Sequence, residues 1–169
     1  MKRPALSLVL AIGAVLILAV TASASSTYYE AISGTELPNA TNTEGQFVGT
    51  ATGSFSGGWY IDVKHQPLWY SPDYITGGSF QLSTVINGWP RTIDGSFVPY
   101  GGTVSQISGF SGCSNQQYRV QGALSGVGIN GGTGSGSFTA TLTHYRKYVW
   151  FVGCVIYAAS VSGSVSLTF

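Results

Sequence analysis

The chain has 169 residues, of which only 8% are charged, and its formal net charge is +1 at pH 7. This length predicts one domain, and the near-neutral charge lacks both the basic footprint of a nucleic-acid-binding protein and a polybasic surface for anionic lipid. Aromatic residues make up 13% of the chain, a share that argues against disorder.

Residues 1–24 have the pattern of a secretory signal peptide. Lys2 and Arg3 precede an uncharged apolar stretch from Ala5 to Val20, and small residues follow up to Ala24. The apolar stretch is shorter than the ~20 residues that cross a bilayer as a helix. We therefore expect cleavage after Ala24 and a secreted protein, whether extracellular, periplasmic or at the cell surface, with membrane contact limited to export.

Residues 25–45 show neither helical nor strand periodicity, and we expect an irregular N-terminal arm there. From residue 46 onward, apolar and polar residues alternate with the two-residue period of β-strands, and glycine-rich turns separate the alternating segments. Eight or nine short strands at regular spacing predict an all-β, single-domain antiparallel barrel, or a sandwich, over residues 46–169. The expected strands are 46–55, 59–65, 78–86, 92–98, 103–110, 117–127, 138–146, 149–155 and 157–169.

The triplet Gly-Ser-Phe occurs four times, ending at Phe55, Phe80, Phe97 and Phe138. Because strand side chains alternate, the Gly and the Phe of each triplet share one face, and the Gly leaves room for a bend or a neighbouring ring. The copies are irregularly spaced, which argues against a repeat architecture. We expect all four Phe side chains in the core.

Cys113 and Cys154 are the two cysteines of the chain. Export to an oxidising compartment predicts a disulfide between them. Two cysteines and two histidines that are far apart in the sequence give little support for a metal centre, and the glycine-rich runs lack the helix that a phosphate site needs. We expect neither a metal nor a cofactor.

Aromatic residues in two loops are the first candidates for ligand contact. Trp69, Tyr70 and Tyr74 lie in the irregular stretch 66–77, and Trp89 follows the turn at Asn87. Flat rings with polar tips suit stacking on a carbohydrate or on a small apolar ligand. The alternative is that these rings only cover an open end of the barrel.

His65 and His144 are weaker candidates for catalysis. Each ends the apolar face of an expected strand, so a barrel could bring both to one rim, where a carboxylate would orient one of them as a general base. The alternative is two independent histidines in ordinary hydrogen bonds. No Gly-x-Ser-x-Gly turn occurs between a strand and a helix, so serine hydrolase chemistry has no motif here.

Three short stretches resemble known families. The residues at 57–60, Gly-Gly-Trp-Tyr, resemble the Gly-x-Trp signature of the lipocalins, whose eight-stranded barrels hold small apolar ligands. The glycine-rich strand 49–55 is similar to strands of the dirigent and allene oxide cyclase-like barrels. The final strand, with Val165, Leu167 and Phe169, resembles the last strand of bacterial outer-membrane barrels.

Together these features predict a secreted, non-enzymatic binding or structural module that contacts a carbohydrate or a small apolar ligand. A small barrel isomerase or hydrolase that uses His65 and His144 is the first alternative. An outer-membrane β-barrel is the second.

Overall fold

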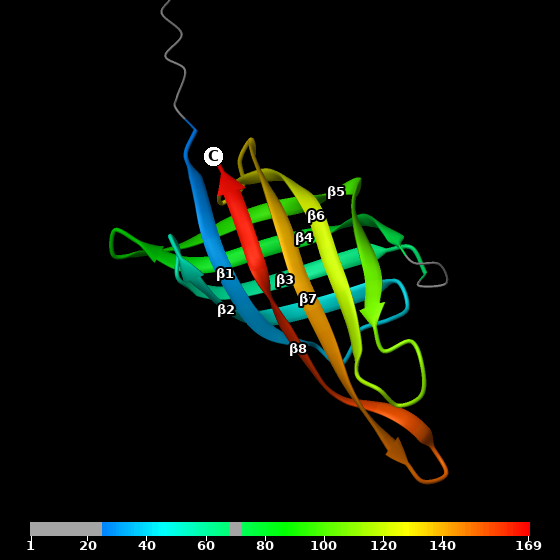
Figure 1. Cartoon of the computed structure of the whole chain (residues 1–169). Coiled ribbons are helices and arrows are strands. Elements are labelled where there is room, and N and C mark those ends of the chain that lie inside the picture. Colours follow the sequence, from blue (N-terminus) through cyan, green and yellow to red (C-terminus); the bar gives the residue numbers. More distant parts are fainter. Residues whose placement is uncertain (1–24, 68–71) are drawn as a thin grey trace, which may run out of the picture.

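The computed structural model describes residues 25–67 and 72–169, so the predicted signal peptide, Trp69 and Tyr70 lie outside the described residues. The described chain forms a closed antiparallel barrel in which each strand pairs with the next one and β8 returns to pair with β1 (Figure 1). This topology confirms the predicted all-β barrel. The strands are β1 (Thr27–Glu36), β2 (Glu44–Gly53), β3 (Gly57–His65), β4 (Asp73–Ile86), β5 (Trp89–Ser108), β6 (Gln116–Ile129), β7 (Gly134–Val149) and β8 (Gly153–Thr168).

The first strand corrects the expectation of an irregular arm over residues 25–45. Residues 27–36 form β1, which pairs with β2 on one side and with β8 on the other. The inward positions of β1 are Glu30, Ile32, Gly34 and Glu36. Two carboxylates and a glycine on the inner face hide the apolar and polar alternation that would have revealed the strand.

The segments 92–98 and 103–110, expected as two strands, are mostly the two halves of β5. Between them the pairing with β6 shifts from Phe97 opposite Leu124 to Gly102 opposite Gly122. Tyr100 has a φ of 61°, in the left-handed region. The glycines after it therefore belong to a bulge that bends one long strand, and not to a turn between two strands.

On β3 and β7 the apolar positions face inward, and the inner faces of the strands form one continuous core. Phe80, Phe97 and Phe138 are buried, whereas Phe55 is partly buried and packs against the core from one end. The outward positions of β7 and β8 are mostly Ser and Thr. On these two strands, an apolar inner face and a hydroxyl-rich outer face are the reverse of the outward apolar band of an outer-membrane barrel. Among the described residues, no helix is long and apolar enough to cross a membrane.

Trp59, the tryptophan of the Gly-Gly-Trp-Tyr stretch, has a structural role. Gly34 and Gly49 face each other across β1 and β2, and a Cβ atom added to Gly49 would lie only 2.6 Å from the Gly34 Cα. The indole Nε1 of Trp59 donates to the backbone oxygens of Ser33, at 3.2 Å, and Thr50, at 3.0 Å. The buried indole therefore bridges the two strands beside the glycine pair.

The two ends of the barrel are built differently. At the end where β1 begins, the rings of Tyr28, Phe55 and Phe169 pack against one another over the core, with the Tyr28 and Phe55 centroids 4.6 Å apart. We call this the closed end. At the opposite end, where β1, β3 and β7 finish, a cavity enters the barrel, and we call this the open end.

A two-stranded ribbon projects from the open end (Figure 1). The pairing of β7 with β6 stops at His144, and the pairing of β8 with β1 stops at Val161. In the described structure, residues 145–149 and 153–158 form strand pairs only with each other, and we call 145–158 the ribbon. The expected strand 149–155 is wrong, because these residues contain the turn of the ribbon.

The predicted Cys113–Cys154 disulfide is present, and it joins the ribbon to the β5–β6 loop. The two cysteines are separated by 41 positions in the sequence. A structural disulfide indicates an oxidising, non-cytoplasmic compartment.

Candidate functional site

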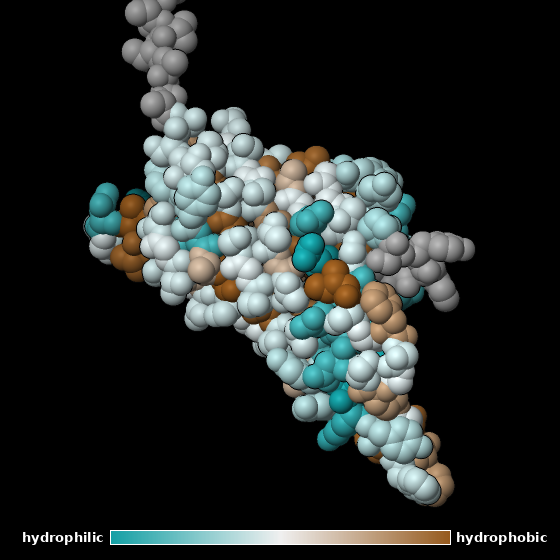
Figure 2. Space-filling model, in the orientation of Figure 1, coloured by the Kyte–Doolittle hydropathy of each residue, from teal (hydrophilic) through white to brown (hydrophobic). Residues whose placement is uncertain are grey.

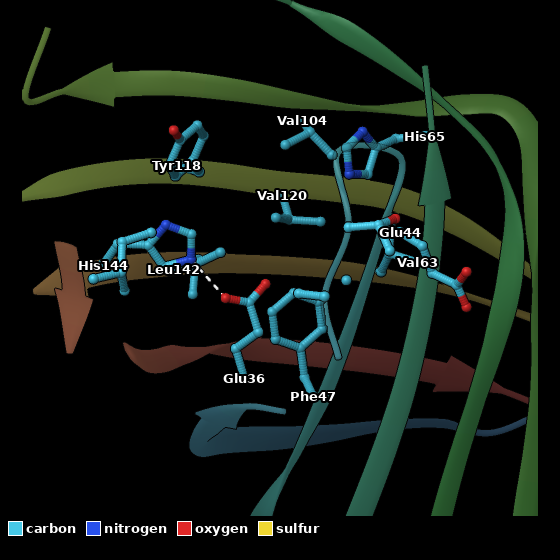
Figure 3. Close-up of a pocket in the computed structure, with 14 residues that line it drawn as sticks. Glu36, Glu44, Phe47, Val63, His65, Val104, Tyr118, Val120, Leu142 and His144 are labelled. Carbon is cyan, nitrogen blue, oxygen red and sulfur yellow. Dashed lines mark hydrogen bonds and ion pairs between the residues drawn. The ribbon is translucent and has the colours of Figure 1, made fainter. Parts of the chain in front are cut away.

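The open end contains a cavity of about 210 Å³, to which every strand except β4 contributes lining residues. Apolar side chains form most of its wall, and two glutamates, two histidines, a threonine and a tyrosine form its polar part (Figure 3). The apolar lining consists mainly of Phe47, Val63, Val104, Val120, Leu142 and Ile156, and the polar part of Glu36, Thr41, Glu44, His65, Tyr118 and His144.

His144 and Glu36 form the closest polar contact in the cavity. The His144 Nε2 lies 2.6 Å from the Glu36 Oε2, and the two side chains are only 14% and 13% exposed. Figure 3 shows the carboxylate of Glu36 directed at the imidazole across the cavity. Because an ionised carboxylate can only accept, the Nε2 of His144 donates its hydrogen. The Nδ1 of a neutral His144 ring is then an acceptor.

His65, on β3, is oriented by the backbone. It is buried at the end of the inward face that also carries Val63, and its Nδ1 lies 2.7 Å from the carbonyl oxygen of Gln66. A carbonyl oxygen only accepts, so Nδ1 carries the hydrogen and the Nε2 of the neutral ring is an acceptor. In each neutral histidine, one ring nitrogen thus donates a hydrogen bond that orients the ring, and the other nitrogen is left as an acceptor.

Tyr118 adds a hydroxyl group to the same cavity. Its ring centroid lies 5.5 Å from that of His144. Burial raises the pKa of the Tyr118 phenol, the nearby Arg146 charge lowers it, and the Glu36 charge raises it again. The net shift is upward, so at neutral pH the phenol keeps its proton and can donate or accept a hydrogen bond.

The cavity brings together the two histidines that the sequence analysis selected. His65 ends β3 and His144 lies near the rim on β7, and the closure of the barrel places both at the open end, beside a carboxylate. The sequence analysis missed Glu36, because the alternation of β1 was not recognised. It also missed Tyr118, although Tyr118 shares the inward phase of Val120 and Leu124, a signal that could have selected it.

The loop aromatics do not gather at one place. Tyr74, near the start of β4, is exposed and lies with Tyr100, their ring centroids 6.4 Å apart. Trp89 is exposed at the hairpin where Ile86 pairs with it, at the other end of β4. Tyr74 and Trp89 therefore do not share a surface, and Trp69 and Tyr70 lie outside the described residues.

Within residues 25–67 and 72–169, no group of three or more His, Cys, Asp and Glu side chains is arranged to hold a metal ion. The side chains of the cavity supply an apolar wall, two oriented imidazoles, two carboxylates and a phenol. Comparisons with protein-family models, with curated proteins and with solved structures find no match to this chain.

Proposed function

We propose that this protein is an exported binding barrel that holds a small, mostly apolar molecule with one hydroxyl or carboxyl group in the cavity at its open end. The observation that carries the proposal is the union of an apolar wall with a polar part built from Glu36, His144 and His65 in one cavity. The signal-peptide pattern of residues 1–24 and the disulfide support export.

The size of the cavity limits the ligand. Its volume of about 210 Å³ lies below the ~300–1,000 Å³ typical of pockets for drug-sized molecules. The apolar wall favours an aliphatic or aromatic body through the hydrophobic effect. A carbohydrate, which presents hydroxyl groups on all sides, fits this wall less well, so the proposal favours the small apolar ligand of the two classes that the sequence suggested.

The polar part of the cavity defines the group that the ligand carries. A neutral His144 or His65 accepts a hydrogen bond from a ligand hydroxyl, and a protonated ring donates one to a ligand carboxylate. The Tyr118 phenol supports either geometry, because it can donate and accept. A purely aliphatic ligand would leave these polar atoms without a partner once it displaced water, which costs free energy.

The test uses the fact that the chain has only two histidines, both of which line the cavity. Their ring C–H signals in an NMR spectrum report on the cavity directly. We expect hexanol, octanoic acid or p-cresol to shift both sets of signals in a saturable manner. Leu142→Phe, which fills the cavity, should weaken the response, and Trp89→Ala should leave it unchanged. Loss of binding in Trp89→Ala but not in Leu142→Phe would place the ligand on the loop aromatics and refute the proposal. Absence of a response to all three compounds would refute it as well.

Acid–base catalysis is a second candidate, favoured by the 2.6 Å contact between His144 and Glu36. A carboxylate that orients a histidine is the arrangement of a general base, and the cavity would present its substrate to that base away from bulk water. An isomerase or hydrolase predicts chemical conversion of a bound compound, followed by mass spectrometry. His144→Gln should abolish conversion while binding persists. Recovery of every bound compound unchanged would leave binding as the function.

A further inference from the structure

The turn of the ribbon exposes three large apolar side chains in succession, Trp150, Phe151 and Val152. Trp150 is 72% exposed and Phe151 is 94% exposed, and their two rings contact only at an edge, with centroids 5.5 Å apart. Figure 2 shows tan and brown atoms at the end of this projection. Large adjoining apolar groups in water are unfavourable and mark a site of interaction.

The ribbon is braced in a way that fixes the position of this apex. An isolated two-stranded hairpin is only marginally stable in water. Here the disulfide ties the ribbon to the β5–β6 loop, and the same loop contacts Arg146. The Arg146 backbone N donates to the Asn115 Oδ1 at 3.1 Å, and its Nη1 donates to the Gly112 oxygen at 3.2 Å. The fold thus holds the apex away from the barrel and does not let the ribbon collapse onto it.

Polarity changes along the axis of the ribbon. Apolar side chains occupy the apex, and two exposed tyrosines, Tyr148 and Tyr157, lie nearer the barrel. Only Tyr148 lies between the apex and the cations, because Lys147 and Arg146 come next, opposite Val155 and Ile156. Tyr157 lies on the barrel side of Ile156, and the Lys147 Nζ reaches over its ring, 5.2 Å from the centroid. From the apex through Tyr148 to Lys147 and Arg146, this order of apolar groups, a ring with a polar tip and cations is that of side chains crossing the interface of a membrane.

Charge is divided unevenly between the two parts of the chain. All six acidic side chains lie at or before Asp94, and the only charged side chains after it are Arg119, Arg146 and Lys147. The ribbon therefore presents cations with no carboxylate of its own. A negatively charged surface complements it, and the anionic head groups of a lipid bilayer are such a surface.

We propose that the apex of the ribbon, residues 150–152, inserts into the interface of an anionic phospholipid membrane and docks the barrel there, independently of the ligand in the cavity. The sequence analysis expected no membrane contact beyond export, because the chain has no basic run. The fold makes such a run unnecessary, since it places Lys147 and Arg146 behind the three apolar side chains, with Tyr148 between them. A protein partner would fit a patch on one face of the ribbon, whereas this gradient follows its long axis.

Flotation of the oxidised protein with lipid vesicles tests the proposal. We expect binding to vesicles of phosphatidylcholine mixed with phosphatidylglycerol, weaker binding to phosphatidylcholine alone, and loss of binding as salt is raised. Trp150→Ser combined with Phe151→Ser should lower the partition coefficient by about tenfold or more, because both rings then stay in water. Trp89→Ser is the matched control, since Trp89 is 68% exposed but lies at the closed end, and it should bind as the wild type does.

A second pair of variants tests the electrostatic part. Lys147→Glu should reduce binding to the anionic vesicles several-fold, and Arg91→Glu, an equal change of charge on the β4–β5 hairpin, should have little effect. The unfolding midpoint of each variant verifies that the barrel is intact, which we expect because the apex makes no core contact. Absence of vesicle binding, or equal losses in the Trp89 and Trp150 variants, would overturn the proposal. The proposal would also be overturned if the protein did not bind vesicles but formed a self-associated species or a protein complex that the Trp150→Ser, Phe151→Ser double variant abolished.

Discussion

Glu30 and Glu36 lie on the same inward face of β1, yet the two ends of the barrel use them differently. Glu30, at the closed end, is 1% exposed, and its Oε1 accepts from the Phe55 backbone N at 2.8 Å. Glu36, at the open end, is paired with His144 in the cavity. The same residue type on one strand face is a structural acceptor where rings cover it and a site residue where a cavity remains. The side chains packed over each carboxylate determine its role, because β1 directs both glutamates inward in the same way.

The ends also differ in what holds them. At the closed end, aromatic rings and buried aliphatic side chains of several strands pack on one another. At the open end, the strands of the ribbon leave the barrel and depend on the disulfide and on Arg146. Stability at the closed end is thus a matter of packing, whereas at the open end a covalent bond supplies much of it.

Removal of the disulfide by Cys113→Ser with Cys154→Ser has the largest expected effect. In the chain-entropy model, a cross-link over 41 positions stabilises the folded state by about 4 kcal/mol. Denaturant unfolding should show a loss of that order. Hydrogen exchange should accelerate most in the ribbon, at residues 145–158, and least in strand segments at the closed end. Uniform acceleration over the whole barrel would contradict the view that the disulfide serves the open end.

Enlarging one buried side chain at each end should cost more unfolding free energy where the interior is filled than where a cavity remains. Val165 is buried on β8 opposite Glu30, near the closed end, whereas Leu142 lines the cavity. Val165→Phe should cost roughly 1–3 kcal/mol of unfolding free energy, because it overpacks a filled core. Leu142→Phe should cost less, because its added atoms enter the cavity. Equal losses in denaturant unfolding would show that the two interiors are packed alike.

The sequence predicted the barrel because its alternation is regular wherever the inner face is apolar. It also brought out His65 and His144, since each continues an apolar face on β3 or β7. It did not predict β1, whose inner face carries Glu30 and Glu36, and the site was therefore incomplete. Closure of the barrel, a long-range event that no local pattern records, is what sets Glu36 of β1 beside His144 of β7.

The ribbon shows a different limit of sequence reasoning. Residues 149–155 are apolar, and an apolar run predicts a buried strand. In the fold they form an exposed turn, and Phe151 has a φ of 66°. Apolar character alone cannot distinguish a buried strand from an exposed apex, because it does not say how far the neighbouring strands extend. Only the pairing of β6 and β1, which stops short of these residues, reveals it.

The smallest expected effects are those of substituting the two glutamates, and they distinguish the closed end from the open end most directly. Burial raises the pKa of Glu30 above its ordinary value of 4.5, and hydrogen bonds from the Phe55 and Ser54 backbones oppose this shift only in part. The folded state then binds the proton more tightly than the unfolded state. Consequently the free energy of unfolding falls as pH rises from about 4.5 through the folded-state pKa of Glu30. Glu30→Gln keeps an oxygen for the Phe55 amide and should remove this part of the pH dependence in denaturant unfolding.

Glu36→Gln should show the opposite profile. The amide oxygen still accepts from the His144 Nε2, so we expect the free energy of unfolding to change by no more than about 1 kcal/mol. Ligand binding, followed through the histidine signals, should weaken, because an amide offers one acceptor oxygen where the carboxylate offers two and therefore holds the His144 ring less firmly. Glu30→Gln should leave ligand binding intact, since Glu30 lies at the other end of the core. Two outcomes would contradict the assignment of Glu30 as structural and Glu36 as functional. In one, Glu36→Gln changes stability without changing ligand binding. In the other, Glu30→Gln also weakens ligand binding, so that the inward face of β1 acts as one unit from end to end.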